Sequence, residues 1–297
     1  MSRHDKILVT GARGQLGREL AAALSAHGEI VAVDRAALDL ADRTNVVRTV
    51  RSVRPTLIVN AGAYTAVDRA EQERDLAFAV NATAPGILAE EARRCGAVLI
   101  HYSTDYVFDG AQRTPYSESA PPDPLNVYGA SKLGGERAIA HVSASALTFR
   151  TSWIYSLVGS NFLLTMRKLA AERDELRVVA DQTGVPNWSR ALARATATLV
   201  SRGNAYLAER AGLYHMCAGG EATWYEFARA IVGGQAHPRI VPITTAEYPT
   251  PARRPAYGVL DTQLFRRTFG FALPQWQATL KECVTSAAEP PVAEAVG

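Results

Sequence analysis

The chain has 297 residues, of which 47% are hydrophobic and 21% are charged. These values are typical of a globular protein and exclude a largely disordered chain. The 32 basic and 29 acidic residues leave a net charge of +3 and form no basic run, so we expect no nucleic-acid partner. No apolar stretch approaches the roughly 20 residues that span a membrane, and the first residues lack the layout of a signal peptide. We therefore expect no membrane segment, and the three widely spaced cysteines, which predict no disulfide framework, favour a reducing cytoplasm.

The first half of the chain alternates apolar, strand-like runs with segments of helical period. We expect strands at 6–12, 29–34, 55–63 and 97–105, and helices at 15–27, 45–53 and 75–94. Strands that are apolar almost throughout, each followed by a helix, are typical of sheets buried on both faces. The pattern therefore predicts an α/β fold with a doubly wound, parallel, Rossmann-like sheet.

The second half is less regular. We expect helices at 128–141, 161–171, 189–202 and 224–232, a strand at 146–155, and an extended, irregular segment across the five prolines of 238–255. We expect residues 1–155 to form mainly a dinucleotide-binding domain. Residues 156–288 would form mainly a smaller substrate-binding lobe, from which some strands and helices return to the first domain. The tail at 289–297 is expected to be disordered.

The sequence GARGQLG follows the first expected strand and opens the first expected helix. Gly11 would allow the tight turn, Gly14 would let a pyrophosphate approach the backbone, and Gly17 would let the helix pack closely on the sheet. The spacing is GxxGxxG rather than the commoner GxGxxG. In this strand–turn–helix context it still predicts nucleotide binding. The cofactor-binding residues expected here are Gly11, Gly14, Gln15, Leu16 and Gly17.

Two neighbouring residues give opposite signals on the identity of the cofactor. Asp34 ends the second expected strand, where an acid binds a ribose hydroxyl and favours NADH, whereas Arg35 would pair with the 2′-phosphate of NADPH. Both cofactors therefore stay open. Asp39 is equally compatible with a turn and with cofactor binding. The small residues Ala61 and Ala63, in NAGAYT after the third strand, would let adenine or ribose lie against the backbone, or would serve tight packing.

Tyr128 and Lys132 are four residues apart in an expected helix and therefore share one face. Thr104 ends the fourth expected strand, where ligands bind in an open parallel sheet. A ketone that accepts hydride also needs a proton, which a tyrosine hydroxyl supplies when a nearby lysine lowers its pKa. We therefore predict a carbonyl-reduction site with Tyr128, Lys132 and Thr104 as catalytic residues.

These motifs, together with NAGAYTAVDRAE, HYSTDYVFDG, PLNVYGASKLGGE, FRTSWIY, NFLLTM and DQTGVP, resemble the extended short-chain dehydrogenase/reductase family over nearly the whole chain. The groups WYEFA and YPTPARRPAYGVLD are similar to those of its members that reduce a dTDP-linked 4-dehydro sugar. The resemblance implies NAD(P)H-dependent reduction of C4 of dTDP-4-dehydro-β-L-rhamnose to dTDP-β-L-rhamnose, the last step of dTDP-L-rhamnose biosynthesis. Alternatives are a 4-epimerase or 4,6-dehydratase of the same family, or a non-catalytic NAD(P)-sensing subunit.

The resemblance also implies roles for individual residues. Tyr128 would be the proton donor, Lys132 would bind the ribose and tune Tyr128, and Thr104 would touch the sugar oxygen. The implied cofactor-side residues are Asp39, Leu40, Ala63, Tyr64 and Thr65, and the implied substrate-side residues are Thr104, Asp105 and Trp153.

Two further predictions come from the residues themselves. Asn161 is expected either to cap a helix or to touch the nucleotide. One of Arg253 and Arg254 is expected to clamp the diphosphate, and we predict Arg253.

Some family members bind Mg²⁺ between subunits through acidic side chains. Position 15 is glutamine here, so we identify no magnesium ligand, and a monomer and a homodimer both stay open.

Overall fold

The computed structural model describes residues 6–142, 144–233 and 238–286, so the expected disordered tail at 289–297 lies outside the described residues. Its centre is a six-stranded sheet in which every neighbouring pair is parallel, in the order β10-β5-β4-β3-β1-β2. The strands are β1 (Lys6–Thr10), β2 (Glu29–Val33), β3 (Leu57–Asn60), β4 (Val98–Thr104), β5 (Ala146–Thr151) and β10 (Gly212–His215). The predicted doubly wound α/β fold is therefore confirmed.

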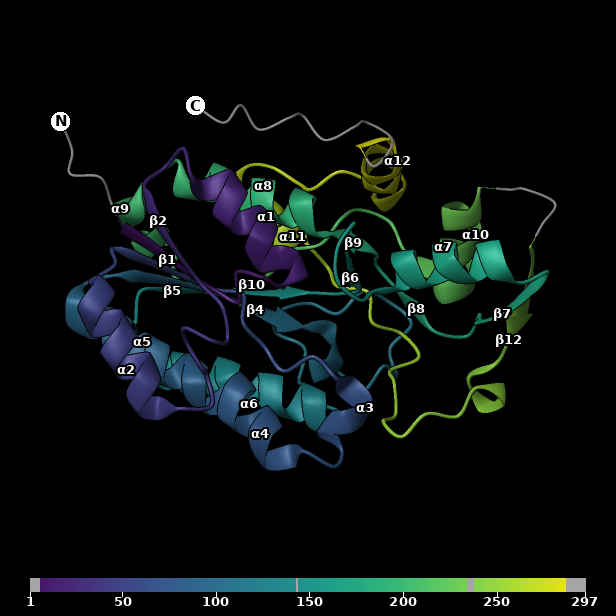
Figure 1. Cartoon of the computed structure of the whole chain (residues 1–297), viewed down its shortest axis with the longest axis horizontal. Helices are drawn as coiled ribbons and strands as arrows, with labels where there is room; N and C mark the ends of the chain where they lie inside the picture. Colours follow the sequence, from purple (N-terminus) through teal and green to yellow (C-terminus); the bar gives the residue numbers. More distant parts are fainter. Residues whose placement is uncertain (1–5, 143, 234–237, 287–297) are drawn as a thin grey trace.

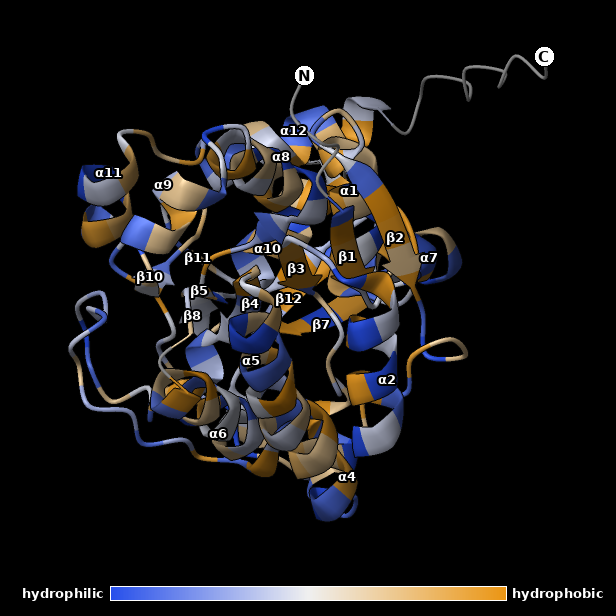
Figure 2. Ribbon diagram, turned by 90° about the vertical axis from the view of Figure 1, so that its left-hand side faces the viewer, coloured by the Kyte–Doolittle hydropathy of each residue, from blue (hydrophilic) through white to orange (hydrophobic). Residues whose placement is uncertain are grey.

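Helices cover both faces of this sheet (Figures 1 and 2). One face carries α1 (Gln15–Leu24), α8 (Ser189–Val200), α9 (Asn204–Glu209) and α11 (Gln263–Phe269). The other carries α2 (Arg43–Val53), α4 (Arg74–Phe78), α5 (Ala84–Cys95) and α6 (Val127–Val142). Leu16, Leu20 and Leu24 are buried against the first face because their four-residue spacing puts them on one side of α1.

A smaller lobe lies beside the carboxyl ends of the strands. It contains α7 (Phe162–Glu172), α10 (Trp224–Val232) and α12 (Trp276–Ser286), and the two-stranded sheets β7 (Glu175–Val179)–β12 (Arg239–Ile243), β8 (Thr183–Gly184)–β11 (Ala222–Thr223) and β6 (Ile154–Tyr155)–β9 (Asn187–Trp188). It has its own apolar core around Phe227 and Trp188. The later elements β10, α8, α9 and α11 pack on the main sheet instead. Within the described residues, no helix combines the length and apolar character of a membrane span.

The structure corrects three expected elements. The helix expected at 75–94 is α4 and α5 joined by a π-helical turn, η1 (Ala79–Thr83), because Pro85 has no N–H for a regular ladder. The strand expected at 146–155 breaks after Thr151, where Trp153 has a φ of 41°. The segment at 238–255 is not wholly irregular, since β12 pairs with β7 and η3 (Thr245–Glu247) follows. Pro242 is tolerated there because β12 has only one neighbouring strand.

Candidate active site

A cavity of about 820 Å³ lies at the carboxyl ends of β1, β3 and β4, between the main sheet and the smaller lobe. The chain runs from β1 to β2 on one side and then crosses back to β3 on the other side of β1, so this is the switch point at which parallel sheets bind ligands. The structure brings most of the predicted site residues to its wall: Gly11, Gly14, Gln15, Leu16, Asp34, Arg35, Asp39, Leu40, Ala61, Ala63, Tyr64, Thr65, Thr104, Asp105, Tyr128, Lys132, Trp153 and Asn161. Gly17 and Arg253 do not line it.

The glycine loop is built as its spacing predicts. Gly11 has a φ of 65°, and a Cβ on it would lie 2.7 Å from the backbone of Gly62. A Cβ on Gly17 would lie 2.2 Å from the Gly11 carbonyl oxygen, so Gly17 serves the close packing of α1 rather than the cavity wall. Gly14 is the N-cap of α1 and provides no side-chain cap, so the first amides of α1 are available to an anion in the cavity.

Asp34 is held by its own turn and by a residue that the sequence analysis missed. Its Oδ1 accepts hydrogen bonds from the amides of Ala36 and Ala37, at 3.0 and 3.2 Å. Its Oδ2 lies 2.7 Å from Nε of Arg13, whose side chain is 84% exposed. Arg13 also lines the cavity, near Arg35. The signal that was overlooked is the arginine within the glycine loop itself.

The π-helical turn positions the loop after β3. Asn81, in this turn, accepts a hydrogen bond from the amide of Tyr64 at 2.8 Å and donates one to its carbonyl at 2.9 Å. The same side chain donates to Ser131 on α6, at 3.0 Å. Asn81 thus links the cofactor-side loop to the helix that carries Tyr128. No sequence motif indicated this role, because it depends on contacts 17 and 50 residues away.

Helix α6 lies close to the end of β4 because its glycines allow it. A Cβ on Gly129 would lie 2.1 Å from the carbonyl oxygen of Tyr106, and a Cβ on Gly135 would lie 2.2 Å from that of Asn81. Asn126 caps the helix by accepting a hydrogen bond from the Gly129 amide at 2.8 Å. These contacts bring the first turns of α6, and with them Tyr128, to the cavity.

The three predicted catalytic side chains meet at this wall. Burial raises the pKa of Tyr128 to about 12, and the nearby Thr104 hydroxyl opposes this. Burial lowers the pKa of Lys132 to about 8, and the charge of Glu136 opposes this. Lys132 Nζ donates to the carbonyl of Tyr102. Burial is therefore the main influence on the pKa of Tyr128 here, and the role of Lys132 in lowering that pKa stays a prediction.

Asp105 is a buried carboxyl next to these residues. Its Oδ1 accepts a hydrogen bond from Thr104 Oγ1 at 3.1 Å, whereas its Oδ2 has no hydrogen-bond partner among the described residues. Burial raises the pKa of Asp105 to about 7. A Cβ on Gly258, from the other lobe, would lie 2.5 Å from Oδ2. Asp105 therefore has one buried carboxylate oxygen that lies against Gly258 and has no hydrogen-bond partner among the described residues.

Aromatic residues form the wall on the side of the smaller lobe. The Trp153 ring stacks on that of Trp224, with centroids 3.5 Å apart and planes at 8°. Gly184 leaves the space for it, since a Cβ there would lie 2.5 Å from the Trp153 ring. Trp224 opens α10 and was missed, although it belongs to the WYEFA group. Asn161 caps α7 and donates to the carbonyls of Ser156 and Val158, so the structure shows the capping role.

Two other features carry less chemistry. A second hollow of about 790 Å³ between α2, α5 and the end of α6 contains none of the predicted site residues, and its acids Glu90 and Glu91 already pair with arginines. No cluster of three or more His, Cys, Asp or Glu side chains that could hold a metal exists in the part of the chain that the structure describes. Gln15, where an acidic magnesium ligand was sought, accepts a hydrogen bond from Ser156.

A parallel doubly wound sheet with a glycine loop, and a partly buried tyrosine and a buried lysine beside a threonine at a strand end, define a nicotinamide-dependent oxidoreductase. The sequence profile of the family described as RmlD substrate binding domain matches residues 5–289, and the chain belongs to this family.

Named relatives agree with this assignment. The chain is 46% identical over 291 residues to the dTDP-4-dehydrorhamnose reductase of Burkholderia thailandensis, covering 94% of this chain and 98% of the relative. It is 44% identical over 287 residues to that of Escherichia coli, covering 93% and 95%. The crystal structure of the dTDP-4-dehydrorhamnose reductase from Bacillus anthracis in complex with NADP is 34% identical, with a TM-score of 0.90, over 96% of this chain and 100% of that chain.

Proposed function

We propose that the chain reduces the C4 ketone of dTDP-4-dehydro-β-L-rhamnose to the alcohol of dTDP-β-L-rhamnose, with NADPH or NADH as the reductant. The observation that carries the proposal is the meeting of Thr104, Tyr128 and Lys132 at one cavity wall that faces the glycine loop on one side and the smaller lobe on the other. The similarity to reductases of the same name over almost the whole chain supports the substrate.

The residues at the glycine loop fit a dinucleotide. The uncapped start of α1 offers amide donors to a pyrophosphate, and the small residues Ala61, Gly62 and Ala63 leave a flat wall for adenine or ribose. Bound NADPH or NADH would supply the hydride. Arg13 and Arg35 would receive the 2′-phosphate of NADPH, and the similarity to an enzyme solved with NADP supports this choice.

Tyr128 would donate its proton to O4 of the sugar as the C4–H bond forms, so that the ketone becomes a neutral alcohol. Its raised pKa keeps the phenol protonated at neutral pH, before the reaction. Thr104, whose hydroxyl donates to Asp105 in the structure, would turn that hydrogen to the same sugar oxygen and stabilise the developing negative charge. Lys132 would hold the nicotinamide ribose, and Asp105 and Trp153 would contact the hexose.

Several coarser proposals accompany this one. Residues 1–155 would mainly form the dinucleotide-binding unit and residues 156–288 mainly the substrate-binding lobe. A nucleotide sugar is a small polar substrate made inside cells, so we place the enzyme in the cytoplasm, acting without nucleic acid or membrane. Both a monomer and a homodimer are compatible with this reaction.

The direct test is the absorbance of reduced nicotinamide. Purified protein is mixed with NADPH or with NADH, and dTDP-4-dehydro-β-L-rhamnose is generated in place by the upstream enzymes. We expect substrate-dependent oxidation with formation of dTDP-β-L-rhamnose, and the two rates give the cofactor preference. A folded protein that binds either cofactor but oxidises neither would overturn the substrate assignment. Tightly bound NAD⁺ in the purified protein would indicate an epimerase instead.

A further inference from the structure

Residues 250–258, called the strap here, run from the smaller lobe across the catalytic end of the main sheet. The strap is bonded to β8, because Thr183 donates to the Ala256 carbonyl and accepts from the Gly258 amide through its own carbonyl, both at 2.8 Å. On the other side, a Cβ on Gly110 would lie 2.5 Å from Pro255, and a Cβ on Gly258 would lie 2.5 Å from Asp105 Oδ2. The strap therefore touches both lobes beside the predicted active site.

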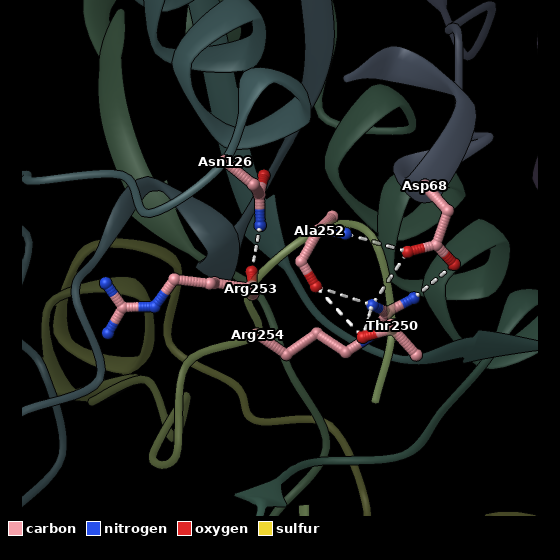
Figure 3. A network of polar contacts seen from close by, with 6 residues as sticks. All are labelled: Asp68, Asn126, Thr250, Ala252, Arg253 and Arg254. Carbon is pink, nitrogen blue, oxygen red and sulfur yellow. Dashed lines mark hydrogen bonds and ion pairs between the residues drawn. The ribbon is translucent and has the colours of Figure 1, made fainter. Parts of the chain in front are cut away.

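An ion pair between distant segments holds the strap. Arg254 donates from Nη1 and Nη2 to the two carboxylate oxygens of Asp68 in α3 (Val67–Ala70), at 2.9 and 2.8 Å (Figure 3). The Ala252 amide donates to the same carboxylate at 3.1 Å. Arg254 also donates to Thr250 Oγ1 at 2.6 Å and to the Ala252 carbonyl at 2.8 Å. A planar guanidinium bonded in this two-pronged way fixes orientation as well as distance.

A second contact joins the strap to the catalytic helix. Asn126 Nδ2 donates to the Arg253 carbonyl at 2.7 Å (Figure 3), while Asn126 Oδ1 caps α6 through the Gly129 amide. Glu71, just after α3, accepts a hydrogen bond from the Val127 amide at 2.8 Å. The same short region around α3 thus holds the strap through Asp68 and the start of α6 through Glu71.

The two arginines of the strap have different surroundings. The guanidinium of Arg254 is engaged by the Asp68 carboxylate and two strap oxygens and is only 20% exposed, so it is held toward Asp68. Arg253 is exposed, and Figure 3 shows its guanidinium extending away from Asp68. The backbone of Arg253 is nevertheless fixed, since its carbonyl is bound by Asn126.

We propose that Asp68, Arg254 and Asn126 are positioning residues for the nucleotide-sugar substrate, which hold the strap so that Arg253 faces the diphosphate and Gly258 lies against Asp105. The inference rests on the proposed function, because it assigns a diphosphate-bearing sugar to this side of the cavity. Asp68 and Arg254, like the strap residues 250–258, do not line the cavity, so they act on binding only through the position of the strap. Their loss should therefore weaken binding of the sugar nucleotide and not that of NADPH.

The test uses four variants. Arg254→Gln, Asp68→Asn and the double variant that combines these two substitutions are compared with Arg253→Gln. Arg177→Gln is the control, because it removes an exposed ion pair with Glu247 elsewhere in the same lobe. Amide hydrogen exchange of residues 250–258 measures how firmly the strap is held. Calorimetry with dTDP measures affinity at the diphosphate site, and quenching of NADPH fluorescence measures affinity at the cofactor site. KM and kcat are measured with the 4-dehydro sugar nucleotide.

In Arg254→Gln and Asp68→Asn we expect faster amide exchange in the strap. The Kd for dTDP and the KM for the sugar nucleotide should rise about tenfold, whereas kcat and the Kd for NADPH should stay within about twofold of the unmodified protein. The double variant should be no worse than the poorer single one, because the two side chains act as a unit. Arg254→Lys should not restore binding, since a point charge cannot replace the fork. Arg253→Gln should weaken the binding of dTDP without speeding up amide exchange in the strap.

Two results would overturn the proposal. One is unchanged strap exchange and dTDP affinity in Arg254→Gln. The other is an equal loss of affinity for dTDP and for NADPH in Arg254→Gln, which would show that the pair of Asp68 and Arg254 only stabilises the fold. Failure of the proposed function looks different: the unmodified protein would bind NADPH but neither bind dTDP nor turn over the sugar nucleotide. Strap exchange would then still decide whether Asp68 and Arg254 fix this segment.

Discussion

Arg150 donates from Nε and Nη2 to the two carboxylate oxygens of Glu136, at 2.8 and 2.6 Å, one helical turn beyond Lys132. Both side chains are buried, at 3% and 7% exposure. Removal of one partner leaves an uncompensated buried charge. We expect Glu136→Gln to lower the free energy of unfolding by about 3–5 kcal/mol, measured by urea denaturation. A loss below about 1 kcal/mol, the range of an exposed pair, would contradict this.

The same substitution should change the pH dependence of the reaction. Burial lowers the pKa of Lys132 to about 8, and the Glu136 charge raises it against that effect. Without this charge, Lys132 loses its proton at lower pH and no longer holds the ribose as a cation. We expect the alkaline fall of kcat/KM to move to lower pH in Glu136→Gln. Glu282→Gln, which breaks an exposed pair with Arg194, is the control and should leave the profile in place.

Tyr128→Phe removes the proposed proton donor while keeping the ring. General acid catalysis contributes about 10²–10⁴-fold, so we expect kcat to fall by that factor. The Kd for NADPH, measured by fluorescence, should rise by no more than about tenfold, because a single neutral hydrogen bond contributes about 0.5–1.5 kcal/mol. Tyr155→Phe is the matched control, since its hydroxyl is buried against Thr279 away from the cavity. Turnover near that of the unmodified enzyme in Tyr128→Phe would refute the assignment of the donor.

The local motifs of the sequence were sufficient to predict most of the main sheet and much of the wall of the cavity, but not the edge strand β10. The turn at Gly11 and the shared helix face of Tyr128 and Lys132 depend on residues within one or two turns of each other, so spacing alone indicates them. The pairing of Asp68 with Arg254 spans 186 residues, and only the folded chain brings the two together. Trp224 was missed for the same reason, since its stacking partner Trp153 lies far away in the sequence.

The raised pKa of Tyr128 shows a second limit of motif reading. A YxxxK spacing indicates which side chains share a face, but the effect of Lys132 on the pKa of Tyr128 depends on burial of both groups. Likewise, the position of Asp34 at a strand end predicts a ribose ligand. In the structure its carboxylate also binds two turn amides and Arg13.

Arg13→Ala should reduce the preference for NADPH. The exposed guanidinium of Arg13 lies at the mouth of the glycine loop, 2.7 Å from Asp34, where a 2′-phosphate would meet it. A hydrogen bond to a charged group contributes about 1.5–3 kcal/mol, so we expect kcat/KM for NADPH to fall about tenfold or more and that for NADH to change little. Arg18→Ala, an exposed arginine of α1 outside the cavity, is the control. Equal losses with both cofactors would exclude Arg13 from phosphate recognition.

Asp105→Asn should stabilise the protein above neutral pH. Burial raises the pKa of Asp105 in the folded protein to about 7, above the ordinary value of 3.8 that applies when the chain unfolds. The folded state therefore holds the proton more tightly, and stability is lost as the pH rises from about 4 to about 7. Asparagine has no proton to lose at this position. We expect Asp105→Asn to gain a few kcal/mol, of the order set by the pKa shift, relative to the unmodified protein over that range.

Denaturant unfolding at pH 4, 5.5, 7 and 8 measures this difference. Asp109→Asn gives the matched comparison of opposite sign, because the Ala111 amide, together with the Tyr116 hydroxyl, lowers the pKa of Asp109. Asp109 therefore stabilises the folded state above about pH 4, and this contribution disappears as the pH falls. Asp109→Asn should be destabilising at pH 7 and near neutral in effect at low pH. The difference in free energy of unfolding between Asp105→Asn and the unmodified protein should grow between pH 4 and 7. If it does not, Asp105 is ionised in the folded enzyme over this range. It would then accept rather than donate a hydrogen bond at the sugar.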